Sequence, residues 1–316
     1  PSITAAPIVA SATWKPGPGQ AALRARFTLP PFTASAPRIS LPGVAGVLNV
    51  QGGPLQAEAR VSATLHADLQ ARTAELADWV TMATLPDVQG GTVALDAQGR
   101  ARVALASETL EVQLAGRLDE SRFEGRFSLR GFGSSAHDFD LDVDRIDLDR
   151  YRAAGAPPAA GTETGGADAP LDLSPLRDLN AAGRVRVGAL KAAGVVVQQL
   201  RAELRASAGR LVVEPLAADL YGGRASGSLV LEAGSPPRLA TKQAWSGVAL
   251  GPLMKDTLGQ ETLTGRGTLA LDVTTQGSTV PMLKRALEGS ARIELRDGSV
   301  RGLNVAQTVR GAAALL

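Results

Sequence analysis

The chain contains no cysteine among its 316 residues and only two histidines, His66 and His137. Disulfide bonds, zinc–thiolate sites and cysteine nucleophiles are therefore excluded. His66 falls on the polar side of an alternating segment, and neither histidine has a partner at the spacing of a metal site or a catalytic triad. We expect a protein that is not an enzyme and that uses neither a metal nor another cofactor.

Neither sign of charge dominates, because 33 lysines and arginines face 31 acidic residues, for a net charge of +2. Acids and bases alternate instead of clustering, and aromatic residues make up only 3% of the chain. A nucleic-acid-binding surface usually has a concentrated basic stripe with interleaved aromatics. We therefore expect no nucleic-acid partner.

Long apolar runs are also missing, since none reaches the roughly 18 residues that cross a bilayer. The chain does not start with the basic and then apolar pattern of a signal peptide. Pro1 begins inside a strand-like pattern and Leu316 ends inside an apolar helical run. We expect a piece of a longer protein whose membrane anchor lies outside this sequence.

What the chain has instead is a period of two, with apolar residues at every second position. The clearest stretch is Leu200 to Glu232, where glycine-containing turns near Gly209 and Gly222 separate three alternating segments. This period predicts strands with one apolar and one polar face. We count roughly 16 to 18 such strands, far more than an ordinary sheet holds. The sequence predicts a mainly β fold: a long, twisted antiparallel sheet curled into a U-shaped groove, with a few short helices.

A few segments interrupt this alternation. Helices are expected at Thr73–Ala83 with Thr73 as N-cap, after Ser174 as N-cap, at Pro252–Leu258 and Pro281–Leu287 with Gly259 and Gly289 as stops, and after Asn304. Turns are expected at Ala97-Gln98-Gly99, within a hairpin, and at Asp297-Gly298. Residues 153–170 lack large apolar side chains and predict a flexible linker or loop between residues 1–152 and 171–316. The same strand pattern continues on both sides, so one sheet could include both halves.

A row of acids at Asp138, Asp140, Asp142 and Asp144 is the strongest hint of a metal site. An EF-hand loop needs a glycine at its sixth position and a glutamate at its twelfth, and both are missing. The intervening apolar residues predict a strand whose polar face carries the acids. We expect ion pairs with arginines of the preceding strand, which are Arg122, Arg126 and Arg130.

The chain contains the segments GRLVVEPLAADLYGGRASGSLVLEA (209–233) and IDLDRYRAAGAPP (146–158), the latter followed after a linker by LDLSPLRDLNAAGRVRVGAL (171–190). These segments resemble signature repeats of the AsmA family of bacterial envelope proteins, and the closing region 263–310 resembles that family's C-terminal region. The resemblance spans about residues 140 to 316. It implies a periplasmic protein held in the inner membrane by an N-terminal helix that is absent here, acting in phospholipid transport and outer-membrane homeostasis. The family is similar to chorein-type bridge proteins, whose strands curl into a groove that carries acyl chains, and other envelope proteins are possible partners.

The apolar faces supply candidate residues for such a groove. They are Val61, Leu65, Leu69, Leu110, Val112, Leu114, Phe123, Phe127, Leu204, Leu220, Leu229, Leu269, Leu271, Ile293 and Leu295. A continuous apolar surface would offset the ~0.8 kcal/mol that water costs per exposed methylene group of a phospholipid tail. The same residues would equally serve the filled core of a β-sandwich. The alternative function is therefore a structural or assembly scaffold of the envelope that binds no lipid.

Overall fold

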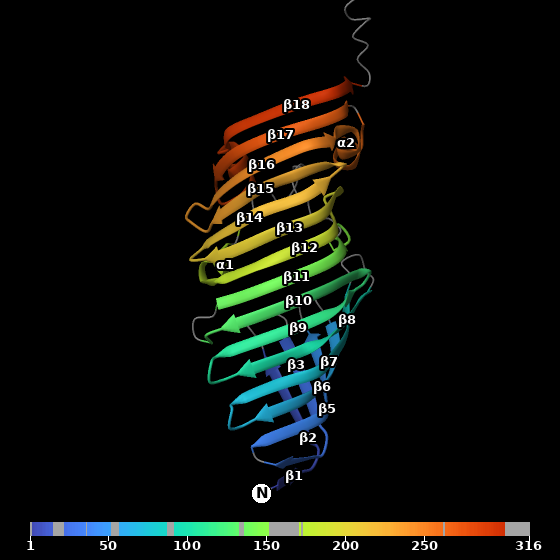
Figure 1. The fold of residues 1–316 in the computed structure, drawn as a ribbon, viewed down its shortest axis with the longest axis vertical. Coiled ribbons are helices and arrows are strands. Elements are labelled where there is room, and N and C mark those ends of the chain that lie inside the picture. Colours follow the sequence, from blue (N-terminus) through green and yellow to red (C-terminus); the bar gives the residue numbers. More distant parts are fainter. Residues whose placement is uncertain are drawn as a thin grey trace, which may run out of the picture.

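A computed structural model describes residues 2–14, 22–35, 37–51, 57–86, 92–132, 136–151, 171, 173–261 and 263–300. Eighteen strands within these ranges form a single sheet. Most of them follow one another along the long axis of the molecule, and dark-blue strands near the N-terminus pass behind the others at a steeper angle (Figure 1). Three short helices accompany them in the described part of the chain. The prediction of a mainly β protein built from one long, open sheet is confirmed.

The strands are numbered along the chain. They are β1 (Ser2–Ala5), β2 (Ile8–Trp14), β3 (Ala22–Leu29), β4 (Phe32–Ser35), β5 (Arg38–Gln51), β6 (Ala57–Asp68), β7 (Thr73–Pro86), β8 (Thr92–Ala104), β9 (Thr109–Leu118), β10 (Ser121–Arg130), β11 (Ala136–Asp147), β12 (Ala181–Ala192), β13 (Val195–Ser207), β14 (Arg210–Leu220), β15 (Gly223–Glu232), β16 (Arg238–Ala249), β17 (Leu263–Gln276) and β18 (Glu288–Val300). The helices are α1 (Ser174–Asp178), α2 (Leu250–Leu258) and α3 (Val280–Arg285).

Strand pairing follows chain order from β5 to β18, and each strand is antiparallel to the next with one exception. The exception is β11 and β12, which pair in parallel along the register Phe139↔Gly183 and Leu141↔Val185. At the N-terminal end, β5 pairs with both β3 and β4, which in turn pair with β2 and β1. One sheet therefore includes strands from both sides of the expected linker, whose residues 153–170 lie outside the described ranges.

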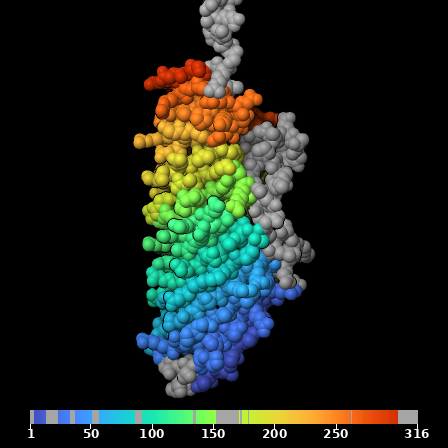
Figure 2. All heavy atoms as spheres, turned by 90° about the vertical axis from the view of Figure 1, so that its right-hand side faces the viewer, coloured from blue at the N-terminus to red at the C-terminus, as the bar shows by residue number. Residues whose placement is uncertain are grey.

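The described part of the sheet is a single layer. Backbone contacts join each strand to the strands beside it, and they join the short helices to β13, β14 and β17. Seen from the side, the strands stack as one narrow column from the N-terminal to the C-terminal end (Figure 2). Repeated register shifts, as between Leu41 and Val44, are β-bulges that bend strands and increase their twist.

The helix expected at Thr73–Ala83 is wrong, because this segment is strand β7. The register against β8 jumps between Leu76 and Trp79, and Asp78 has a positive φ of 48°. A bulge therefore adds one residue between Leu76 and Trp79, which lie on the same face. The resulting spacing of three imitates the stripe of a helix.

Two expected turns are also wrong. Gly99 lies inside the continuous strand β8, opposite Trp79 and Leu114, so no hairpin forms there. Asp297 and Gly298 lie inside β18, where Asp297 has a φ of 52° and the register against β17 shifts. Both glycines mark close approaches or bulges instead of chain reversals.

The other helices match their expected positions within a few residues. Gly259 ends α2 in the left-handed conformation, as predicted, and its N–H donates to the Lys255 carbonyl. Ser174 is the first residue of α1 and not its N-cap, and Gly289, expected as a helix stop, lies within β18. The helix expected after Asn304 lies outside the described residues.

Two glycines of one cross-strand row allow a matched test of the close backbone packing. A Cβ added to Gly99 would lie 2.1 Å from the Gln113 carbonyl oxygen, whereas one added to Gly125 would meet nothing closer than 3.6 Å. We expect Gly99→Ala to lower the free energy of unfolding by about 1–3 kcal/mol through forced backbone shifts. Gly125→Ala should be neutral or slightly stabilising, because it restricts the unfolded chain. Urea unfolding followed by circular dichroism measures both, and equal effects would contradict this packing.

Candidate functional site

The apolar positions of successive strands line up into rows that cross the sheet. The strand registers connect one row over fourteen strands, from β5 to β18, in which Thr241 has the only polar side chain. The row consists of Leu41, Leu65, Leu76, Ala101, Val112, Phe127, Phe139, Gly183, Leu204, Val213, Leu229, Thr241, Val273 and Gly289. At about 4.8 Å between strands, its thirteen spacings extend about 62 Å.

A second row runs beside the first and alternates small with large residues. Gly99, Leu114, Gly125 and Leu141 follow one another across β8 to β11. The leucine side chains lie beside the glycines, since a Cβ added to Gly125 would meet Leu141 Cδ1 at 3.6 Å and Leu114 Cδ1 at 3.7 Å. The apolar face is therefore continuous across these four strands.

This face is only half buried, which separates it from the core of a sandwich. Val112, Phe127 and Phe139 are each partly accessible, and among the described residues only ten hydrophobic side chains are buried.

The structure places fourteen of the fifteen candidate groove residues on the strands of this face. The exception is Leu69, which lies in the turn after β6 and is 59% exposed. Ile293 and Leu295 lie on the edge strand β18, where they are 72% and 42% exposed. The sequence pattern missed His137, which takes its place between Leu129 and Ala181 on the apolar face. Its ring lies 5.7 Å from that of Phe127.

Helix α2 lies over one edge of the apolar face near its C-terminal end and forms one wall of a partly open pocket of about 480 Å³. The sheet contributes Val197, Leu220 and Trp245, and the helix contributes Leu253 and Met254. The helix lies at one edge of the sheet, beside the ends of β15 to β17 (Figure 1). The local sequence pattern predicts the helix but not the pocket, because a local pattern does not show which strands a helix contacts.

Polar contacts hold α2 against neighbouring turns. The Tyr221 hydroxyl donates to Asp256 Oδ2 at 2.7 Å and accepts from the Val196 N–H at 3.3 Å. Partial burial and the bond to Asp256 raise the pKa of Tyr221. Gly194 fits closely as well, because an added Cβ would lie 2.6 Å from the Asp256 carbonyl oxygen. The position of α2 is therefore fixed by its surroundings.

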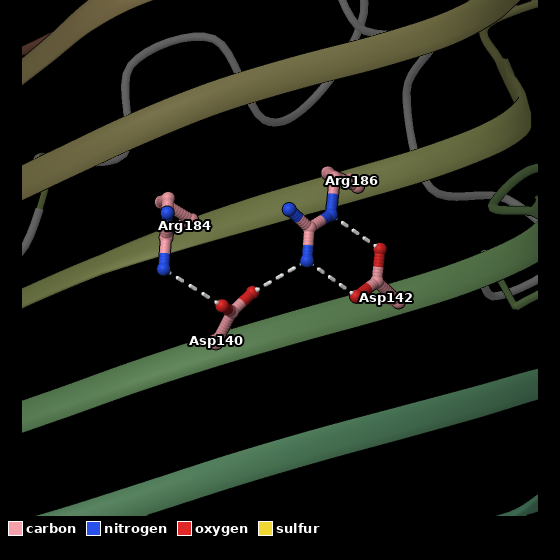
Figure 3. Close-up of polar contacts among 4 residues, drawn as sticks. All are labelled: Asp140, Asp142, Arg184 and Arg186. Atoms are coloured by element: carbon pink, nitrogen blue, oxygen red, sulfur yellow. Dashed lines mark hydrogen bonds and ion pairs between the residues drawn. The ribbon is translucent and has the colours of Figure 1, made fainter.

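The opposite face is polar and carries ion pairs at the parallel junction of β11 and β12 (Figure 3). Asp140 accepts from Arg184 Nη2 and Arg186 Nη2, both at 3.1 Å, and Asp142 accepts from Arg186 Nε at 2.6 Å and Nη2 at 2.7 Å. The expected pairing with the preceding strand holds for Arg130 and Asp138, but Arg122 contacts Asp144 only through its backbone N–H. Asp140, the cross-strand neighbour of Arg126, accepts instead from Arg184 and Arg186 beyond the linker.

A hollow of about 870 Å³ over this polar face is lined by charges of both signs, including Arg100, Glu124, Arg126 and Asp142. Such a lining suits water better than an acyl chain. Within the described ranges, no group of three or more acidic or histidine side chains could hold a metal ion. None of the helices that the structure describes is long and apolar enough to cross a membrane.

The described strands define a one-sided β-sheet protein with a continuous apolar face about 60 Å long. The AsmA family model matches residues 127–315, so the chain belongs to the AsmA family. Members of this family are generally associated with the bacterial envelope. Searches of curated proteins and of solved structures gave no match.

The ion pairs at the junction predict a pH dependence of stability. The hydrogen bond from Arg186 holds the pKa of Asp142 below its usual value. The stability that Asp142 contributes is therefore present above about pH 4 and is lost as the pH falls through its lowered pKa. Asp142→Asn should remove this acid-sensitive contribution to stability. At neutral pH it should lower the free energy of unfolding by less than about 1 kcal/mol, since the pair is solvent-exposed.

Urea unfolding between neutral and acidic pH measures this effect, with Asp219→Asn on an exposed site of β14 as control. The difference between Asp142→Asn and the unmodified protein should shrink with added salt. An unchanged pH profile in Asp142→Asn would contradict the assigned role of this pair.

Proposed function

We propose that this protein binds phospholipid acyl chains along its apolar face and carries them through the bacterial envelope. The observation that supports this most is the fourteen-strand apolar row, which is continuous and only half buried. A phospholipid tail that lies against this row exchanges contact with water for contact with Leu, Val and Phe side chains. The proposed action is binding and guidance, without catalysis.

The free-energy cost of exposing a lipid tail to water explains why a continuous apolar face would assist lipid transfer. Each exposed methylene group costs ~0.8 kcal/mol, so a 16-carbon tail in water costs on the order of 10 kcal/mol. A groove with gaps would impose part of this cost at every gap. Because the row has an apolar or small residue on thirteen of fourteen successive strands, a tail could move along it with small changes in solvation.

The cellular setting is part of the proposal. Family membership supports a place in the envelope. We propose that the apolar face works in the periplasm, that the full-length protein is anchored in the inner membrane by a segment preceding this sequence, and that it contributes to phospholipid transport and outer-membrane homeostasis. Other envelope proteins are proposed to receive or deliver the lipid.

The test uses a charge on the proposed groove. Val112→Asp and Leu229→Glu should each reduce co-purifying phospholipid at least several-fold, because a carboxylate on the apolar row repels a tail that has displaced water. Both side chains are only partly buried, so the new charge can keep some hydration and the fold should persist. Native mass spectrometry of protein purified from cells measures the bound lipid.

The control variants are Gln113→Asp and Ser226→Glu, which place the same charges on the exposed polar face of the same two strands. They should retain lipid like the unmodified protein, and circular dichroism checks that all four variants fold. A folded, unmodified protein without bound phospholipid would favour the scaffold alternative. Global unfolding of both groove variants would point to a filled core.

A further inference from the structure

We propose that the pocket beneath α2 holds the terminal part of a single acyl chain. This inference rests on the proposed function, because the chain must reach the pocket along the apolar face. The pocket, at about 480 Å³, falls within the range of about 300–1,000 Å³ that is usual for small-molecule sites. The chemistry of the pocket walls and the length of the pocket indicate which ligand fits it.

The walls are almost entirely hydrocarbon. On the sheet side Val197, Leu200 and Trp245 line the pocket, and on the helix side Leu253 and Met254 do so. The polar side chains among the lining residues are Gln243 and Thr257. A ligand with several polar groups would lose its hydration here without finding partners, whereas an alkyl chain loses nothing.

The dimensions suit one chain lying across the strands. The pocket extends from β13 to β16, which is three strand spacings, or about 14 Å. An extended covalent chain advances roughly 1.2 Å per bond, so about a dozen carbon atoms fit. The headgroup then remains outside, toward the uncovered part of the groove.

Enclosure distinguishes this site from the rest of the row. Among the described residues, the helices contact mainly β13, β14 and β17 and not the middle strands β8 to β12. Beneath α2 the tail has apolar walls on both sides, and burial of both sides increases the stabilisation. The bond from Tyr221 to Asp256 and the close fit at Gly194 hold the helix in place. The pocket is thus a retention site at the C-terminal end of the groove.

Two tryptophans provide a reporter inside the pocket and one outside it. Trp245 lines the pocket, whereas Trp79 lies on the apolar face of β7, opposite Gly99. The double variant Trp14→Phe/Trp79→Phe keeps Trp245 as its single tryptophan. The double variant Trp14→Phe/Trp245→Phe keeps Trp79. The probes are phosphatidylcholine vesicles with bromine atoms either near the end or near the carbonyl of the acyl chain, and bromine quenches indole fluorescence on contact.

We expect both tryptophans to be quenched, and Trp245 to be quenched more strongly by terminal bromine than by bromine near the carbonyl. Ala218→Phe fills the pocket and should raise the lipid concentration for half-quenching of Trp245 at least tenfold, leaving Trp79 unchanged. The matched control Ala101→Phe makes the same change on the uncovered part of the row and should leave Trp245 quenching intact.

The outcomes separate the two proposals. If lipid quenches Trp79 but does not quench Trp245, the pocket assignment is overturned and the proposed function still stands. Quenching of Trp245 that Ala218→Phe does not weaken would also overturn the pocket. A folded protein in which neither tryptophan is quenched would contradict the proposed function itself.

Discussion

The rest of this structure depends on an apolar sheet face against which no second described sheet packs. Burial of apolar surface is the main force that stabilises folded proteins, and most sheets satisfy it by packing against another layer. Here the backbone hydrogen bonds of eighteen strands hold the sheet together, while Val112, Phe127 and Phe139 remain partly accessible. The remaining apolar surface is available to a ligand with the same chemistry. The uncovered face thus connects the fold to the function we propose.

The parallel junction between β11 and β12 makes this face continuous. A purely antiparallel meander would have needed a short turn between these strands, whereas a parallel pair needs a long connection. Asp140 and Asp142 on one strand and Arg184 and Arg186 on the other form ion pairs across this junction on the polar side. On the apolar side, Phe139 and Leu141 face Gly183 and Val185 without a break in the row. The β11–β12 pair therefore carries the ion pairs on the polar face and continues the apolar row on the opposite face.

Helix α2 changes the character of the groove at its C-terminal end. Over the middle of the sheet a tail would be exposed on one side, whereas beneath α2 it would be enclosed. Movement and retention are different tasks, and a single surface of uniform affinity serves only one of them well. A sheet with an uncovered stretch and a covered end provides both, and Tyr221, Asp256 and Gly194 keep the cover in place.

The sequence by itself determined the class of fold and most of the apolar face, because the period of two depends only on local backbone geometry. The alternation from Leu200 to Glu232 and the position of α2 could be predicted for this reason. Tertiary structure decided what local pattern cannot encode. The bulge at Asp78 made β7 resemble a helix, the close approach of the Gln113 carbonyl explained Gly99, and pairing across the linker chose Arg184 and Arg186 as partners of the acids. Whether the apolar face is covered was also a tertiary matter, since an alternating strand has the same sequence in a filled core and in an open groove.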